Sequence, residues 1–187
     1  MTNNNKSSKK RFLYDHLYIL IRTIHEQYYV HKKLRENRDK IRNKYPYFFD
    51  SILYSLENSL FADLATLFSN NNKYEQISFN SILKLLDKEK RKSIEEKIKS
   101  NSQIVNKIVE WRNKNKSHKN LKVSMEPEKF EKEYNLKFSE LEKILNPSRE
   151  IYDDIEFILK NEKNPFIISD LRHDLELEIQ SIVTKLS

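Results

Sequence analysis

The stretch RFLYDHLYILIRTIHEQYYVHKKLREN, residues 11–37, decides the fold class because its apolar side chains recur every three or four residues. This spacing places side chains on one face of an α-helix. The members of this stripe are Phe12, Leu13, Leu17, Leu20, Ile21, Ile24, Tyr28 and His31. The sequence therefore predicts a long first helix over residues 10–37 with one buried face.

A second stripe of the same kind begins just after Pro46 and ends at a run of three asparagines, residues 70–72. Proline is favoured in the first turn of a helix, where its missing N–H has no helical partner. The stripe consists of Phe49, Ile52, Leu53, Leu56, Leu60, Leu64, Leu67 and Phe68. Two such stripes joined by a short connection predict helices at 10–37 and 47–68 that pack antiparallel.

The rest of the chain also has helical patterns, and no stretch alternates as a β-strand does over a useful length. Polar caps and prolines mark where we expect helices to begin or break. The predicted helices are a short one after Ser78, a charged one over 88–112 with a break at Asn101-Ser102, one from Glu126 onward, one that starts at Asn146-Pro147, and one over 170–186.

The chain has no glycine, which narrows both the fold and the chemistry. Glycine is needed where the backbone takes a positive φ or approaches a ligand closely. A P-loop, a GxGxxG turn and a GxSxG nucleophile elbow are therefore excluded, and tight β-hairpins become unfavourable. We predict an all-α fold: a helical bundle with long antiparallel helices and additional C-terminal helices.

The length of 187 residues suits one core, so we expect a basic, disordered tail at 1–8 followed by a single domain over 9–187. The absence of cysteine excludes disulfides and thiolate chemistry and fits a reducing compartment. Charged residues interrupt the N-terminal stretch, which argues against a signal peptide and a membrane span. We expect a soluble, cytoplasmic protein without a membrane partner, and its net charge of +7 suits an anionic partner such as nucleic acid.

One segment differs from the rest of the chain. The run WRNKNKSH, residues 111–118, crowds an arginine, an asparagine, two lysines and a histidine at the end of an apolar helix pattern. On an unbroken helix, Arg112 and His118 would lie about 120° apart around the axis. A shared site therefore requires the helix to bend or end between them, and the intervening polar run has helix propensity weak enough to allow this.

This run resembles the signature of the HEPN superfamily, in which an arginine and a following polar residue precede a histidine by a few positions. Arg112, Asn113 and His118 match it. More narrowly, the chain is similar to AbiU-type abortive-infection proteins, whose helices before this run correspond to residues 64–68 and 81–86. Two positions depart from that pattern: Ser117 stands where alanine is usual, and Asn120 stands where an aspartate often follows the histidine. The second departure would weaken a hydrogen bond that orients the imidazole.

The resemblance implies a metal-independent endoribonuclease without a cofactor. His118 would act as the general acid or base, and Arg112 would bind the phosphate. Asn113 can either hydrogen-bond the phosphate or hold the arginine. The basic side chains of Lys114, Lys116 and Lys119 would attract RNA without reading its sequence.

HEPN sites commonly form at a two-fold interface, so the resemblance also implies a homodimer. The expected role is that of a ribonuclease in phage defence or in a toxin system, with an antitoxin or regulatory protein as a further partner. The alternative is a noncatalytic helical module that binds RNA or a partner protein. Other residues have plainer interpretations. We expect Trp111 to anchor the core or an interface rather than to stack on a base. We expect His16, His25 and His31 to be structural rather than metal ligands.

Overall fold

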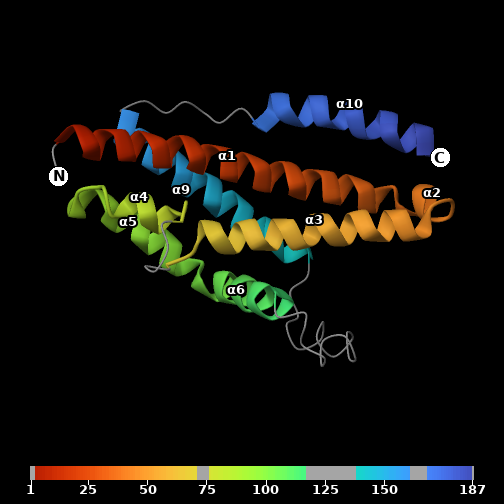
Figure 1. Ribbon diagram of the computed structural model, residues 1–187, viewed down its shortest axis with the longest axis horizontal. Coiled ribbons are helices and arrows are strands. Elements are labelled where there is room, and N and C mark those ends of the chain that lie inside the picture. The colour runs from red at the N-terminus through yellow and green to blue at the C-terminus, as the bar shows by residue number, and fades with distance from the viewer. Residues whose placement is uncertain (1–2, 71–75, 117–137, 161–167, 187) are drawn as a thin grey trace. The chain divides into compact units, whose positions relative to one another are not determined.

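Every regular element in the described part of the chain is helical. The computed structural model describes residues 3–70, 76–116, 138–160 and 168–186. The elements in chain order are α1 (Asn3–Glu36), α2 (Arg38–Arg42), α3 (Pro46–Leu67), α4 (Phe79–Leu83), α5 (Lys88–Ser100), α6 (Ser102–Lys116), the 3₁₀ helix η1 (Phe138–Leu141), α9 (Glu142–Lys160) and α10 (Ile168–Leu186) (Figure 1). The predicted all-α fold is confirmed.

The chain divides into two compact units that interleave along the sequence. Unit 1 comprises Met1–Ile21 and Phe61–Asn164, and unit 2 comprises Arg22–Leu60 and Pro165–Ser187. The two long helices α1 and α3 each contribute one part to unit 1 and the other part to unit 2. The expectation of a single domain over 9–187 remains a prediction.

Unit 2 is built on the antiparallel pairing of α1 with α3. Gln27 on α1 donates a hydrogen bond to Ser59 on α3, with Nε2 2.9 Å from Oγ. One turn further along α1, His31 lies opposite Glu57, so position increases on one helix as it decreases on the other. The predicted antiparallel arrangement therefore holds in this unit.

Unit 2 contains an apolar cluster to which each of its four helices contributes. The buried members of this cluster are Leu34 on α1, Ile41 on α2, Phe49 on α3, and Ile179 and Val183 on α10. Tyr29, Val30, Ile52, Leu53 and Leu56 pack against them. Burial of this apolar surface is the main force that holds the four helices together.

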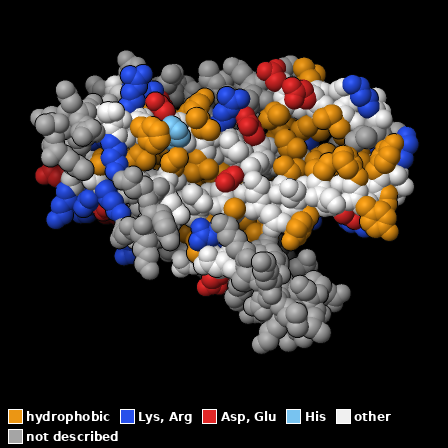
Figure 2. Space-filling view, in the orientation of Figure 1, with side chains coloured by type: hydrophobic (Ala, Val, Ile, Leu, Met, Phe, Trp, Pro, Cys, Tyr) orange, Lys and Arg blue, Asp and Glu red, His pale blue; other side chains and the backbone are white. Residues whose placement is uncertain are grey.

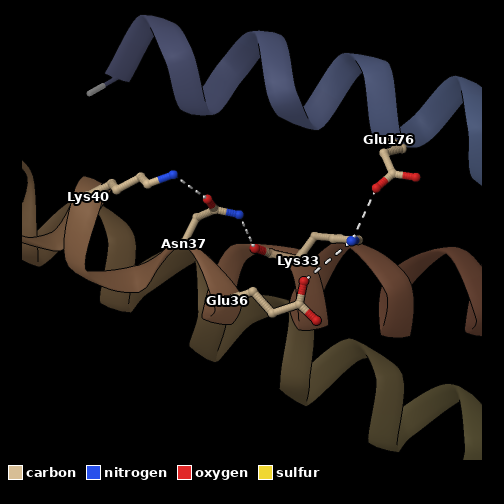
Figure 3. A network of polar contacts seen from close by, with 5 residues as sticks. All are labelled: Lys33, Glu36, Asn37, Lys40 and Glu176. Carbon is tan, nitrogen blue, oxygen red and sulfur yellow. Dashed lines mark hydrogen bonds and ion pairs between the residues drawn. The ribbon is translucent and has the colours of Figure 1, made fainter.

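Polar contacts fasten α10 to the end of α1 (Figure 3). Lys33 pairs with Glu176 of α10 at 3.2 Å and with Glu36 at 3.4 Å. The bond to Glu176 is the main reason why the pKa of Lys33 is raised. Asn37 donates from Nδ2 to the carbonyl of Lys33 at 3.0 Å and accepts from Lys40 at 3.4 Å, which links α1 to α2.

Unit 1 packs the first part of α1 and the last part of α3 with α4, α5, α6, η1 and α9. Its largest fully buried side chains include Leu17, Phe61, Leu64, Phe79, Ile82 and Tyr152. An ion pair between Lys97 of α5 and Asp154 of α9, 2.5 Å apart, supplements the apolar contacts. None of the described helices combines the length and apolarity needed to cross a membrane.

Several local signals act as predicted. Pro46 is the first residue of α3. Ser78 is the N-cap of α4, and its side-chain oxygen accepts a hydrogen bond from the backbone N–H of Ser81 at 3.2 Å. Asn101 separates α5 from α6, so the expected break falls where the polar pair predicts it.

Other boundaries differ from the prediction. Helix α1 starts at Asn3, before the predicted start at residue 10, because an established helix gains a hydrogen bond with each added residue. The short α2 was not predicted because its five residues contain one apolar side chain, Ile41, which gives no periodicity.

Pro147 lies inside α9 rather than at the start of a helix. Proline in a helix interior loses a hydrogen bond, but Ile144, Ile151 and Ile155 are fully buried on one continuous face of α9. Burial of that face outweighs the local preference of proline. The helix expected from Glu126 lies mostly outside the described residues.

Candidate functional site

Helix α6 carries the candidate site near its C-terminal end. Ile108 is buried, and one turn later the ring of Trp111 lies against that of Phe61 on α3, with centroids 4.2 Å apart. Phe61 is itself buried in unit 1. This contact places the half-buried Trp111 against the core of unit 1, as expected of an anchor, and turns this side of α6 toward α3.

Arg112 follows this anchor directly and is half-buried, whereas Asn113 is exposed. Successive helix residues are rotated by about 100°, so Arg112 lies beside the buried face of α6 rather than on it. A long basic side chain in this position can keep its stem against the protein and its charge in water.

The Arg112 guanidinium donates two hydrogen bonds to Oδ1 of Asn113, from Nε at 3.3 Å and from Nη2 at 3.0 Å. This contact is compatible with a role for Asn113 in holding the arginine, and both roles expected for Asn113 remain predictions. Two of the five guanidinium N–H groups are used in this way, and the amide nitrogen of Asn113 is a further donor of the same kind. The pair therefore presents N–H donors suited to the oxygens of a phosphate.

The remaining predicted site residues are less fully described. Lys114 and Lys116 belong to the last turn of α6. His118, Lys119, Ser117 and Asn120 lie outside the described residues. Arg112 and Asn113 are thus the members of the predicted site that the structure brings together.

The three histidines of α1 contact other parts of the protein or are buried within it. Nδ1 of His16 lies 2.9 Å from the carbonyl oxygen of Phe12, one turn earlier, and the two rings are also in contact. His25 and His31 are buried. Within the described ranges, His, Asp and Glu side chains do not gather into groups of three or more that could hold a metal ion.

The surroundings of His31 change its pKa. Burial, helped by the nearby positive charge of Arg35, lowers the pKa of His31 from 6.5 to about 4. Nε2 lies 4.0 Å from Oε2 of Glu57, a pair that would be an ion pair only if the imidazole were protonated. With the pKa so low, the imidazole is neutral at neutral pH and the contact with Glu57 carries no ionic attraction.

Unit 1 also contains a buried polar cluster that the sequence did not reveal. Tyr152 donates to the hydroxyl of Tyr14, and Tyr14 donates to Oε1 of Glu156, both at 2.5 Å. Nζ of Lys160 lies 3.1 Å from the same oxygen and 4.7 Å from the centre of the Tyr14 ring. Burial raises the pKa of both tyrosines, so the two hydroxyls remain protonated donors.

A sequence signal for this cluster exists on α9. Tyr152 and Glu156 are four residues apart and each directly follows a buried isoleucine, so both lie near the inward face. A glutamate in such a position needs partners, because burial of an unpaired carboxylate is costly. The sequence pattern shows the need but does not identify Tyr14 as the partner.

Comparison with known proteins gives one family. A family model described as AbiU2, of the HEPN type, matches residues 10–177, which is most of the chain. No curated protein and no solved structure matches the chain.

Proposed function

The chain belongs to the AbiU2 family of HEPN-type proteins, and from this we propose that it is a metal-independent endoribonuclease with its active site at the end of α6. The observation that carries the proposal is the pairing of Arg112 with Asn113, which places the N–H donors of two adjacent side chains close together. The roles given below to His118 and to the lysines follow from the family motif and from the chemistry of the side chains.

The proposed reaction uses the 2′-hydroxyl of the substrate as nucleophile. The 2′-oxygen attacks the adjacent phosphorus as its proton passes to a base, and the bond from phosphorus to the 5′-oxygen breaks as that oxygen gains a proton. His118 supplies one of these proton transfers, since an imidazole can accept or donate near neutral pH. Arg112 stabilises the charge that shifts onto the phosphate oxygens. The products are a 2′,3′-cyclic phosphate and a free 5′-hydroxyl.

Asn113 acts in this scheme as a positioning residue. It accepts two hydrogen bonds from one edge of the Arg112 guanidinium and so restricts its rotation. A pre-oriented donor stabilises a transition state more than a mobile one, because it needs no reorganisation during the reaction. Lys114, Lys116 and Lys119 add sequence-independent attraction for the RNA backbone.

We further propose that two copies form a homodimer that brings two such sites together. The motif provides one histidine per chain, His118, which supplies either the acid or the base, and the copy in the partner completes the pair. As in abortive infection, the activity would serve phage defence or a toxin system, under the control of an antitoxin or regulatory protein.

The direct test is incubation of purified protein with single-stranded RNA in the presence of EDTA, with analysis of the product ends. We expect a 2′,3′-cyclic phosphate, and DNA should be spared because it lacks the 2′-hydroxyl. His118→Ala should slow cleavage by about 10²- to 10⁴-fold, the usual contribution of general acid–base catalysis. Arg112→Ala should have a comparable effect.

Matched controls separate chemistry from general charge. His16→Ala removes a histidine of α1, and Arg11→Ala removes an arginine whose side chain is 87% exposed; both variants should cleave at the normal rate. If His118→Ala cleaves as fast as the unmodified protein, or if cleavage requires a divalent metal, the nuclease proposal fails. The chain would then be better described as a noncatalytic module that binds RNA or a partner protein.

A further inference from the structure

A group of exposed aromatic side chains lies at the start of α3, next to the basic residues of α2. We name it the α2–α3 surface and define it by Arg38, Lys40, Arg42, Lys44, Tyr45, Tyr47, Phe48 and Tyr54. Tyr47 is 89% exposed, and Phe48 and Tyr54 are more than half exposed. In Figure 2, hydrophobic side chains lie beside Lys and Arg around α2 and the start of α3.

These aromatic residues are not needed for the core of unit 2. The inward positions of the same segment are filled by Ile41 and Phe49, which are almost fully buried. Tyr47 and Tyr54 are seven residues apart on α3, so they project from the same side of the helix, about 10 Å apart along its axis. Large exposed aromatic side chains grouped in this way are typical of a binding surface rather than of plain solvent-facing sequence.

Positive charge is concentrated in the sequence around this surface. Residues 32–44 contain seven basic and two acidic side chains, a net +5, whereas the whole chain of 187 residues carries +7. Part of this charge serves the fold, since Lys33 pairs with Glu176 and Arg42 with Asp50. Arg38 and Lys40 are exposed, and Nζ of Lys44 lies 6.0 Å from the centre of the Tyr45 ring. A cationic rim beside aromatic rings favours an anionic ligand that also carries flat apolar groups.

We propose that the α2–α3 surface binds single-stranded nucleic acid, with bases stacked on Tyr47 and Tyr54 and phosphates near Arg38 and Lys40. Base stacking on aromatic side chains combined with a basic track is the general chemistry of single-strand binding. Exposed Ser51 and Ser55 interrupt the aromatic face. A membrane-inserting helix would instead present a continuous apolar face. The proposal concerns binding alone and does not depend on cleavage at Arg112.

The test measures binding of a fluorescent 2′-O-methyl oligouridine by anisotropy. This oligonucleotide has no free 2′-hydroxyl and cannot be cut by the proposed reaction, so failure of the nuclease proposal would not affect the result. Tyr47→Ala and Tyr54→Ala should each weaken binding about 5- to 100-fold, the usual effect of losing a stacked base. Tyr47→Phe, which keeps the ring, should bind normally.

Controls address fold and charge. Phe12→Ala removes an aromatic side chain of unit 1 that is 56% exposed and should leave the affinity unchanged. Arg38→Ala should reduce the slope of log Kd against log salt by about 0.7, the value for one phosphate contact on a single strand. Lys92→Ala, at an exposed position of α5, should leave the slope unchanged.

Three outcomes would overturn the proposal. The first is an unchanged affinity in both tyrosine alanine variants whose circular dichroism shows them to be folded. The second is equal affinity for a duplex, whose bases are not open to stacking. The third is that the two variants lose binding to anionic lipid vesicles, or lose self-association in light scattering, while they keep their affinity for the oligonucleotide. The surface would then belong to a membrane or to a second copy of the chain.

Discussion

His31 should make the folded protein sensitive to acid. Its pKa is 6.5 in an unfolded chain and about 4 in the folded protein, mainly because the side chain is buried and also because Arg35 is near. Between these values the unfolded chain binds the proton more tightly, so acid favours unfolding. The stabilisation is fully present above pH 6.5 and is lost as the pH falls toward about 4. At about 1.4 kcal/mol per pH unit, the loss from this one residue is roughly 3 kcal/mol.

The substitution His31→Leu isolates the contribution of this protonation. Leucine fills the buried position with an apolar side chain of similar size that cannot be protonated. Urea unfolding followed by far-UV circular dichroism gives the free energy of unfolding at about pH 7 and about pH 4. Carboxylates titrate in the same range in both proteins, so the informative quantity is the difference between the two pH dependences. That difference should be roughly 3 kcal/mol, with the variant less sensitive to acid.

His16→Leu changes a histidine on the same helix but leaves His31 in place, so the acid sensitivity should persist. If His31→Leu loses as much stability on acidification as the unmodified protein does, then protonation of His31 is not linked to unfolding. Glu57 at 4.0 Å would in that case stabilise the charged imidazole more than burial opposes it.

Three further predictions test other contacts. Asn113→Ala should lower kcat for RNA cleavage about 10- to 100-fold with little change in KM, because Arg112 loses two hydrogen bonds. Asn113→Asp keeps an acceptor for these bonds and should retain most activity. Steady-state kinetics on RNA would measure both variants. Tyr14→Phe should reduce the free energy of unfolding by about 1–3 kcal/mol, because the hydrogen bond to Glu156 is lost. In a double-mutant cycle measured by urea unfolding, the variant that also carries Glu156→Gln should lose less stability than the sum of the losses in the two single variants. Ser78→Ala should cost about 1 kcal/mol in the same assay, whereas Ser78→Asn, which still offers a capping oxygen, should cost little.

The sequence predicts the helices well where a local rule and the apolar pattern agree. Ser78 caps α4, Pro46 begins α3 and Asn101 separates α5 from α6, because each residue acts through its own backbone neighbours. Pro147 shows the limit of this reasoning. Its local preference for a first turn competes with the burial of a continuous face of α9, and the strength of that burial depends on partners that the local sequence does not name.

Among the polar contacts described above, those between sequence neighbours can be predicted from the sequence, and those between distant helices cannot. Arg112 and Asn113 are adjacent in sequence, so their contact can be anticipated from side-chain chemistry alone. The cluster of Tyr14, Tyr152 and Glu156 joins α1 to α9, which lie far apart in the chain. No periodicity in either helix identifies such a partner, since helical spacing determines which face is buried but not what it meets.

The interleaving of the two units also sets an order of events during synthesis. All residues of unit 1 have been made once the ribosome passes Asn164, but unit 2 then still lacks α10. Until Ile179 and Val183 emerge, the apolar side chains of Leu34, Ile41 and Phe49 have no cover from that helix. The newly made chain therefore passes through a period in which unit 1 is complete in sequence while this apolar cluster of unit 2 still lacks the side chains of α10.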